Sequence, residues 1–281
     1  MPTKIEWCDE TWNPVTGCSP ASDGCKNCYA SRMIGRNLPH MGHEGPFSRV
    51  QFHPDRLDQP LRWKKPRRIF VCSMGDLFHE DVKEEWINSV LRVAADTTRH
   101  TFMLLTKRPG RMSAYLNRKW DIPKNVWLGV TAENQATFDE RIPILLQTPA
   151  AKRFVSVEPM LGPVDLGVYG HRMGSPKSAI RGVIDWVIVG GETGPGARPM
   201  HPDWARGLRD QCQAAGVPFF FKQWGEWKGE LGTANWKGRI PLHSYGDGHV
   251  SRRVGKKAAG CLLDGREWKE FPALARKEEG S

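Results

Sequence analysis

Residues 126–134 read VWLGVTAEN, a short apolar run that ends in polar side chains. The run is too short for a buried helix and lacks strict alternation, as expected for a strand covered on both faces of a parallel sheet. Similar runs recur along the chain at residues 68–73, 101–106, 153–158, 186–190 and 218–222. The chain therefore repeats one unit, a buried strand followed by polar residues.

Helical patterns separate these runs. Apolar residues recur at helical spacing within residues 82–93, 138–146 and 204–212, and the last pattern stops at Gly216. Such alternation predicts an α/β fold with parallel strands, here a partial TIM-type (βα)6 barrel. In α/β barrels the carboxyl ends of the strands build the active site, so we expect the polar residues there to be functional.

The pattern breaks near residue 225, where Gly and Lys become dense and turn sequences appear. We therefore expect two units, a barrel of residues 1–224 and an irregular or β-rich C-terminal extension of residues 225–281 packed on it. A second break, the loop from Gly167 to Gly182, carries several basic residues.

The net charge is +10, from 41 Lys and Arg against 31 Asp and Glu. This excess favours polyanionic partners, nucleic acid first, although a basic surface without a partner is the alternative. No run approaches the roughly 18 apolar residues of a membrane span, and the N-terminus lacks the apolar stretch of a signal peptide. We therefore expect a cytoplasmic protein that does not enter a membrane.

Three of the seven cysteines, Cys18, Cys25 and Cys28, crowd into eleven residues with the spacing C-x6-C-x2-C. Turn-forming Gly, Pro and Ser residues between them let the backbone wrap around one centre. Three ligands in one loop fit a [4Fe–4S] cluster whose fourth iron stays open, whereas a structural zinc ion normally takes a fourth protein ligand. The candidates for that fourth ligand are Cys8, His40 and His43.

The cysteines stand within the segments KIEW at residues 4–7, TWNPVTGC at 11–18 and GCKNCYA at 24–30. These segments resemble a phage- and bacteria-associated "three-Cys-motif" family, radical-SAM-like and of unknown function, and the cysteine loop resembles the radical SAM superfamily. The likeness continues at residues 73–79, 105–108, 128–134, 156–159, 190–192, 222–225 and 255–272. The commonest superfamily spacing is C-x3-C-x2-C with an aromatic residue before the last cysteine. Here the first gap is six residues, and the aromatic Tyr29 follows Cys28.

The resemblance implies a radical SAM enzyme. Its [4Fe–4S] cluster would cleave S-adenosylmethionine (SAM) reductively to a 5′-deoxyadenosyl radical for hydrogen abstraction, with flavodoxin or ferredoxin as electron donor. Gly75 and Asp76 stand where the superfamily commonly has Gly-Gly-Glu, so they would hold the ammonium group of SAM. Further residues would contact its ribose, carboxylate or adenine: Tyr29, Lys107, Thr131, Glu133, Asn134, Ser156, Glu158 and Glu192. A helix cap is the alternative role for Asp76 and Asn134, and a turn for Glu192.

The positive charge, the loop of residues 167–182 and the phage association of the family together favour a nucleic-acid substrate. We expect DNA first, in repair or modification, with a peptide or small metabolite as the alternative. A nucleic-acid-binding protein with a structural iron–sulfur or zinc site is a second class, but it would not need acidic and hydroxyl residues at the strand ends. A metal-dependent hydrolase is a third class, and it would want a histidine pair where His79 stands alone.

Overall fold

A computed structural model describes residues 3, 5–36, 42–119, 121–167, 184–231 and 240–273. Its centre is a seven-stranded sheet in which every neighbouring pair of strands is parallel. In spatial order the strands are β1 (Glu10–Trp12), β4 (Arg68–Val71), β5 (Thr101–Thr106), β6 (Val126–Thr131), β7 (Lys152–Val157), β8 (Trp186–Gly190) and β9 (Phe219–Gln223). All six predicted strands are confirmed. The short strand β1 was missed because only Trp12 in it is strongly apolar.

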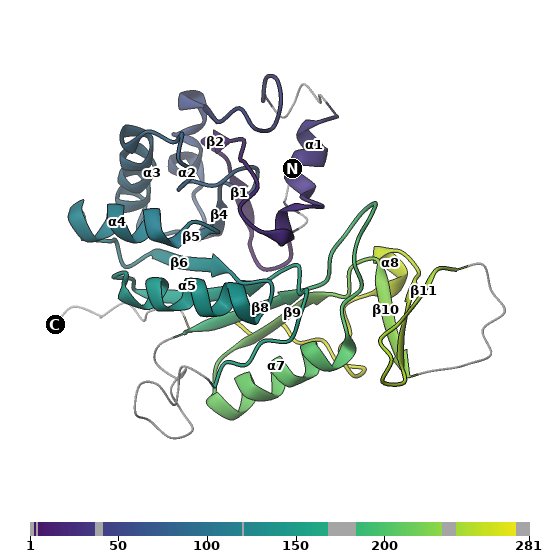
Figure 1. Cartoon of the computed structure of the whole chain (residues 1–281). Helices are drawn as coiled ribbons and strands as arrows, with labels where there is room; N and C mark the ends of the chain where they lie inside the picture. Colours follow the sequence, from purple (N-terminus) through teal and green to yellow (C-terminus); the bar gives the residue numbers. More distant parts are fainter. Residues whose placement is uncertain are drawn as a thin grey trace.

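Helices connect the strands and cover one face of the sheet (Figure 1). Each new strand is added on the same side of the previous one, as in a TIM barrel, and β1 and β9 form the two edges. The predicted α/β fold with a partial barrel is therefore confirmed. The main helices are α3 (Glu84–Asp96), α4 (Pro109–Lys119), α5 (Gln135–Gln147) and α7 (Pro202–Ala215).

The two faces of the sheet have separate cores. Along β6, Leu128 and Val130 pack toward the helices, whereas Trp127 points to the inner, concave face. Aromatic rings fill that inner face, and Trp186 meets the ring of Phe220 edge-on at a centroid distance of 6.0 Å. Because the barrel interior is packed, any site must lie at the ends of the strands.

A long connection joins β1 to β4. It forms a small antiparallel pair, β2 with β3, and short helices. The elements are β2 (Val15–Thr16), the 3-10 helix η1 (Asp23–Cys25), α1 (Tyr29–Ile34), β3 (Gln51–Phe52), the 3-10 helix η3 (Pro54–Arg56) and α2 (Gln59–Arg62).

The C-terminal segment adds an antiparallel sheet at the end of the molecule opposite α3, and the short helix α8 (Figure 1). Further on, the chain covers the edge of β9, where the Phe221 N–H donates to the Trp268 carbonyl at 2.8 Å. The expected β-rich extension is therefore present. The elements are β10 (Trp227–Leu231), β11 (Leu242–Ser244), β12 (His249–Arg253) and α8 (Lys256–Ala259).

Two sequence-based expectations fall outside the described residues: His40 as a zinc ligand, and all but the first residue of the basic loop 167–182. Within the part of the chain that the structure describes, no helix is long and apolar enough to span a bilayer.

Candidate functional site

The three cysteines lie in one loop at the carboxyl edge of the sheet. Cys18 follows β2, Cys25 closes η1, and Cys28 directly precedes α1. All three are free, partly exposed thiols. Gly17, just before Cys18, forms a parallel bridge with Gly75, beyond the end of β4. The cysteine loop, residues 17–28, therefore begins where the strands end.

Two glycines allow this close approach. Gly17 has a φ of +90°, in the left-handed region that favours glycine, and a side chain there would collide with the Arg49 carbonyl. A Cβ on Gly75 would lie 2.9 Å from the Gly17 carbonyl oxygen. Gly75 thus seats the cysteine loop on the barrel, while its predicted contact with SAM stays a prediction.

The Cys18 sulfur receives a cationic hydrogen bond from the start of the α4 segment. Arg108 Nη1 donates to Cys18 Sγ at 3.5 Å, and its Nη2 donates to the Ser19 carbonyl at 3.0 Å. Burial raises the pKa of the Cys18 thiol to about 12, nearby Asp76 raises it further, and Arg108 opposes both. A metal bound to the sulfur would favour the thiolate form of Cys18, because metal ligands must be deprotonated.

His79 supports the same part of the loop. Its Nδ1 accepts the Asp81 N–H at 3.1 Å, so the neutral ring carries its proton on Nε2 and donates it to Ser19 Oγ at 2.7 Å. Burial and the neighbouring Arg108 keep the pKa of His79 below its ordinary value. The single histidine noted in the sequence, His79, is therefore neutral and supports the cysteine loop through this hydrogen bond.

Cys25 has a different environment. The Ala21 N–H donates to its sulfur at 3.4 Å. Burial raises the pKa of Cys25, but the Lys107 ammonium and backbone N–H groups outweigh burial and lower it below the ordinary value. Donors to sulfur are typical around iron–sulfur clusters, whose potential they tune.

Glu133, just after the end of β6, holds the middle of the cysteine loop. Its Oε1 accepts the Ser22 hydroxyl at 2.5 Å and pairs with Lys107, and its Oε2 accepts from Arg141 Nη1 at 3.2 Å. Burial opposes ionisation, yet Lys107, Ser22 and Arg141 together lower the pKa of Glu133 to about 2. The carboxylate is 1% exposed, so it acts as an anchor of the loop.

Glu192, after β8, holds the other end of the loop. Arg198 binds it in a fork, with Nη2 to Oε1 at 2.6 Å and Nε to Oε2 at 2.9 Å. Asn27, next to Cys28, donates to Glu192 Oε2 at 2.9 Å, and Arg198 Nη2 also donates to the Asp23 carbonyl at 3.0 Å. Burial would raise the pKa of Glu192, but these donors lower it. A second buried carboxylate thus anchors the loop.

Asp76 is buried and accepts hydrogen bonds from its own chain. Thr106 Oγ1 lies 2.8 and 2.9 Å from its two oxygens, and the N–H groups of Phe78 and Lys107 donate at 2.9 and 3.2 Å. The helix that follows begins only at Glu84, so Asp76 closes a turn rather than capping a helix. Its predicted contact with the SAM ammonium group is not tested by these bonds and stays a prediction.

Asn134 caps α5. Its Oδ1 accepts the Thr137 N–H at 3.1 Å, which confirms the helix-cap alternative, and its contact with a ribose stays a prediction. The hydroxyl-bearing Thr131 and Ser156 are buried at the ends of β6 and β7, 4% and 2% exposed.

Glu158 differs from the two anchors. Lys222 Nζ, on β9, donates to Glu158 Oε1 at 2.6 Å, and the two side chains keep 15% and 20% exposure respectively. Tyr29, at the start of α1, is 42% exposed and donates its hydroxyl to the Ser73 carbonyl at 2.5 Å. Burial of that hydroxyl raises its pKa, as do the nearby Cys28 and Glu158. These groups keep exposed surface close to the cysteine loop.

Four residues that help to hold the loop in place escaped the sequence analysis, two within the loop and two outside it: Ser22, Asn27, Arg141 and Arg198. The arginines had a readable signal, because they follow their buried carboxylates by eight and six residues and a buried carboxylate needs a cation. Ser22 and Asn27 carry no comparable signal.

The spacing of the cysteine sulfurs can be compared with what a single zinc ion requires. Thiolates bound to one tetrahedral zinc at about 2.3 Å stand about 3.8 Å apart. Among the described residues, three potential ligand atoms all within 4.8 Å of one another occur at His201, Asp203 and His249, and not in the cysteine loop. Cysteines that bind different irons of a cluster stand farther apart.

The two described candidates for a fourth zinc ligand, Cys8 and His43, are engaged elsewhere. Cys8 lies in the inner core and its thiol donates to the Ile5 carbonyl at 3.7 Å, while burial raises its pKa to about 12. His43 Nδ1 lies 2.7 Å from Thr16 Oγ1. The described donor set therefore fits a cluster held by three cysteines with one open iron.

Fold and site together define a class: a partial (βα) barrel that carries a three-cysteine loop over the carboxyl ends of its strands. The chain belongs to the DUF5131 family, described as "Protein of unknown function", whose model matches residues 2–272. Its kinship with the "three-Cys-motif" family stays a prediction.

Similar solved structures are those of spore photoproduct lyase. A cysteine-to-serine mutant is 12% identical, with a TM-score of 0.49 over 92% of this chain and 72% of that chain. The complex with dinucleoside spore photoproduct is also 12% identical, with a TM-score of 0.46 over 87% and 68%. At this level of similarity they establish nothing about the chemistry of this chain. No curated protein matches it in sequence.

Proposed function

We propose that the chain is a radical SAM enzyme whose [4Fe–4S] cluster is bound by Cys18, Cys25 and Cys28. The observation that carries the proposal is the way in which buried side chains hold the cysteine loop in place. Two buried carboxylates, Glu133 and Glu192, clamp it over the strand ends while the three sulfurs stay partly exposed. Buried charged side chains that anchor a loop are expected where the loop must hold a reactive group at a fixed position.

The chain would contribute support on the protein side of the cluster. When bound, the cluster supplies the electron that cleaves SAM reductively. Arg108 and the Ala21 N–H donate to the sulfurs of Cys18 and Cys25 and so favour their thiolate forms. Lys107, paired with Glu133, adds positive charge beside Cys25.

The Glu158–Lys222 pair is the best candidate for binding the methionine end of SAM. The ammonium group of SAM is complementary in charge to Glu158 and its carboxylate to Lys222, and the pair keeps exposed surface at the ends of β7 and β9. Charged hydrogen bonds of this kind orient a ligand strongly. The remaining predicted contacts would complete the site: Tyr29, Gly75, Asp76, Lys107, Thr131, Glu133, Asn134, Ser156 and Glu192.

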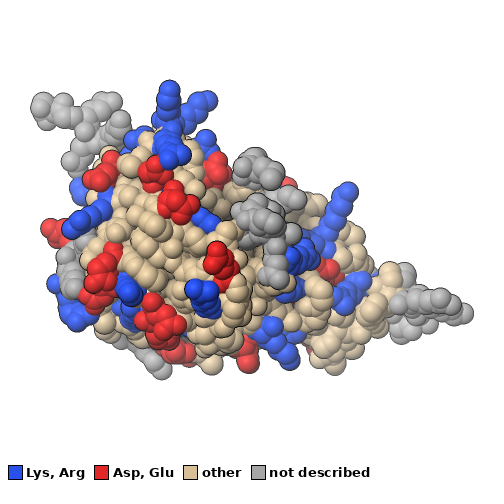
Figure 2. All heavy atoms as spheres, turned by 90° about the horizontal axis from the view of Figure 1, so that it is seen from above, with Lys and Arg blue, Asp and Glu red and all other residues tan. Residues whose placement is uncertain are grey.

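We propose a nucleic acid, DNA first, as the substrate, with repair or modification as the outcome and a small electron-transfer protein such as flavodoxin or ferredoxin as the electron donor. The net charge of +10 supports a polyanionic substrate. Acidic side chains lie among the Lys and Arg on the face drawn in Figure 2, so the positive excess is not gathered into one patch there. A peptide or small metabolite is the alternative substrate.

Iron and sulfide analysis of anaerobically purified protein, with a SAM-cleavage assay under dithionite, tests the proposal. We expect about four irons and four sulfides per chain, together with formation of methionine and 5′-deoxyadenosine. A stoichiometric zinc ion on the cysteines, with no iron after reconstitution, would reject the radical mechanism and leave a binding protein with a structural metal.

A further inference from the structure

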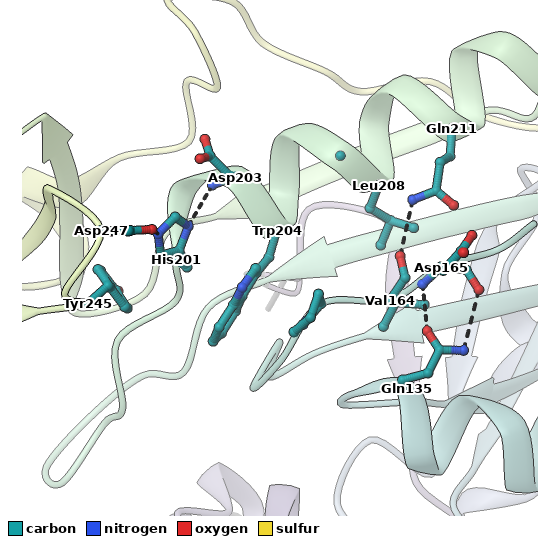
Figure 3. Close-up of a pocket in the computed structure, with 12 residues that line it drawn as sticks. Gln135, Val164, Asp165, His201, Asp203, Trp204, Leu208, Gln211, Tyr245 and Asp247 are labelled. Carbon is teal, nitrogen blue, oxygen red and sulfur yellow. Dashed lines mark hydrogen bonds and ion pairs between the residues drawn. The ribbon is translucent and has the colours of Figure 1, made fainter.

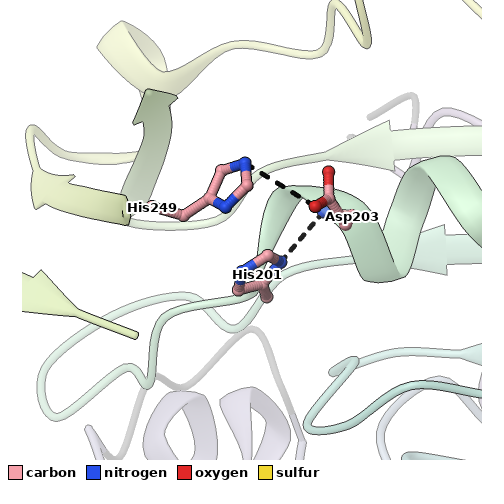
Figure 4. Close-up of side chains that lie close together, drawn as sticks. All are labelled: His201, Asp203 and His249. Carbon is pink, nitrogen blue, oxygen red and sulfur yellow. Dashed lines mark hydrogen bonds and ion pairs between the residues drawn. The ribbon is translucent and has the colours of Figure 1, made fainter. Parts of the chain in front are cut away.

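A second group of metal-ligating side chains lies outside the cysteine loop. His201 and Asp203 stand at the start of α7, and His249 begins β12. One potential ligand atom from each lies within 4.8 Å of the others (Figure 4). The group joins the barrel to the C-terminal sheet, and none of its members contributes to the candidate site described above.

A fourth residue, Asp247, fixes how the two imidazoles are protonated. Its Oδ2 lies 2.9 Å from His201 Nε2, and its Oδ1 lies 3.4 Å from His249 Nδ1. His201 Nδ1 accepts the Asp203 N–H at 3.0 Å, so the proton of the neutral His201 ring is on Nε2 and is donated to Asp247. The lone pair of His201 Nδ1 therefore accepts the Asp203 backbone N–H at the first turn of α7.

His249 is arranged in the same way. Its Nδ1 is buried without a hydrogen bond and faces Asp247, whose carboxylate can accept its proton. Its Nε2 then carries the lone pair and lies 3.6 Å from Asp203 Oδ2. Ligand atoms that lie about 2.0–2.1 Å from a tetrahedral zinc ion stand about 3.3 Å from one another. His249 Nε2 and Asp203 Oδ2 therefore need to move only slightly closer together to share an ion.

We infer that His201 Nδ1, His249 Nε2 and Asp203 Oδ2 form a binding site for a zinc-class divalent cation, with Asp247 as the carboxylate that orients both histidines. Metal-bound histidines commonly donate their second N–H to a carboxylate, which is the position Asp247 occupies. Two imidazoles and one carboxylate suit a borderline transition ion and leave a fourth position for water.

The surroundings favour binding at this place. Arg206 pairs with Asp203 Oδ1 at 2.8 Å, which leaves Oδ2 for the ion. His201 and Asp203 line an open pocket of about 720 Å³, so an ion can enter from solvent. Figure 3 shows His201, Tyr245 and Asp247 at one end of this pocket. The ion must displace the Asp203 N–H from His201 Nδ1, a bond at the first turn of α7 next to an exposed side chain.

Such a site would give the C-terminal extension a structural role. Because its ligands come from α7 and β12, a bound cation would tie the sheet β10–β12–β11 to the barrel. Arg198, which clamps the cysteine loop through Glu192, lies three residues before His201. The cation would thus stiffen the segment that carries this clamp.

Cobalt substitution tests the inference on the full chain. Protein with a reconstituted iron–sulfur cluster is freed of loosely bound metal and titrated with Co²⁺, then with Zn²⁺. We expect the protein to bind one equivalent of Co²⁺, with weak visible bands and no sulfur-to-cobalt charge-transfer band. Zn²⁺ should then displace the bound Co²⁺. Absence of stoichiometric binding, or a cobalt spectrum of thiolate type, overturns the inference.

Variants locate the ion. His249→Gln and Asp203→Asn should each abolish stoichiometric Co²⁺ binding, and Asp247→Asn should weaken it about 10- to 100-fold. His243→Gln, an exposed histidine of the same small sheet, is the matched control and should bind normally. Asp203 is 53% exposed, so Asp203→Asn keeps the fold even if His249→Gln does not. Unchanged binding by Asp203→Asn would overturn the assignment.

Discussion

Three acidic residues end neighbouring parts of the sheet and behave in two ways. Glu133 and Glu192 are 1% and 5% exposed, and both are bonded to the cysteine loop. Glu158 pairs with Lys222 and keeps part of its surface exposed. The sequence presents all three alike, as carboxylates after apolar runs. Two of them therefore hold the loop in place, while the exposed surface of the third supports the proposal that it binds a ligand.

Removal of the ligands themselves should have the largest effect. Replacing Cys18, Cys25 and Cys28 together by Ser should abolish iron binding, since it removes all three proposed ligands. Cys261→Ser, a partly exposed cysteine outside the loop, is the matched control and should keep about four irons in the same iron assay. Retention of iron by the triple variant would place the cluster elsewhere.

Loss of the first anchor should come next. Glu133→Ala leaves Arg141 buried without its carboxylate, and breaking a buried pair costs about 3–5 kcal/mol of unfolding free energy. The variant should also lose most of its iron, because Ser22 and Lys107 are released. Urea unfolding and iron analysis measure the two effects, and Glu140→Ala on the exposed side of α5 is the control.

The second anchor should matter less. In Glu192→Ala the released Arg198 can be hydrated, since its side chain is 31% exposed, so we expect a loss of about 1.5–3 kcal/mol. If Glu192→Ala lowers the free energy of unfolding more than Glu133→Ala does, burial does not determine which anchor contributes more to stability.

Glu158→Gln should leave the cluster unchanged and weaken SAM binding, with little loss of stability because the glutamine oxygen still accepts from Lys222. A lost charged hydrogen bond costs about 1.5–3 kcal/mol, roughly a tenfold to hundredfold change in affinity. Calorimetric titration of SAM into cluster-loaded protein measures it. Loss of iron in this variant would place Glu158 among the anchors, and an unchanged titration would remove it from the SAM site.

Much of the fold was readable because its strands are buried on both faces. Continuous apolar runs such as residues 101–106 and 186–190 mark such strands without reference to the rest of the chain. The cysteine loop was equally clear, because three thiols at close spacing have few structural explanations. Strand β1 was hidden, since two of its three residues are polar and its pairing with β4 depends on a distant segment.

The roles of the acidic residues could not be read in the same way. A carboxylate at a strand end reads the same whether it meets a ligand or an arginine from another element. Asn27 reaches Glu192 from a segment 165 residues away, and only the folded chain brings the two together.

The smallest effect concerns the substrate. If the positive charge serves nucleic-acid binding, log K should fall linearly with log salt. Neutralising Arg172, Lys177 and Arg181, which lie outside the described residues, should flatten the slope without changing the cluster. Filter binding or anisotropy at several salt concentrations measures it. No binding to DNA or RNA at low salt would favour a peptide or metabolite substrate.

The electron paramagnetic resonance spectrum of the dithionite-reduced protein, recorded with and without SAM, tests the central claim most directly. We expect the signal of a reduced [4Fe–4S] cluster in the wild-type chain, absent from the triple cysteine variant and changed in shape by SAM at the open iron. A wild-type spectrum without this signal after reconstitution, or a signal that saturating SAM leaves unchanged, would contradict it.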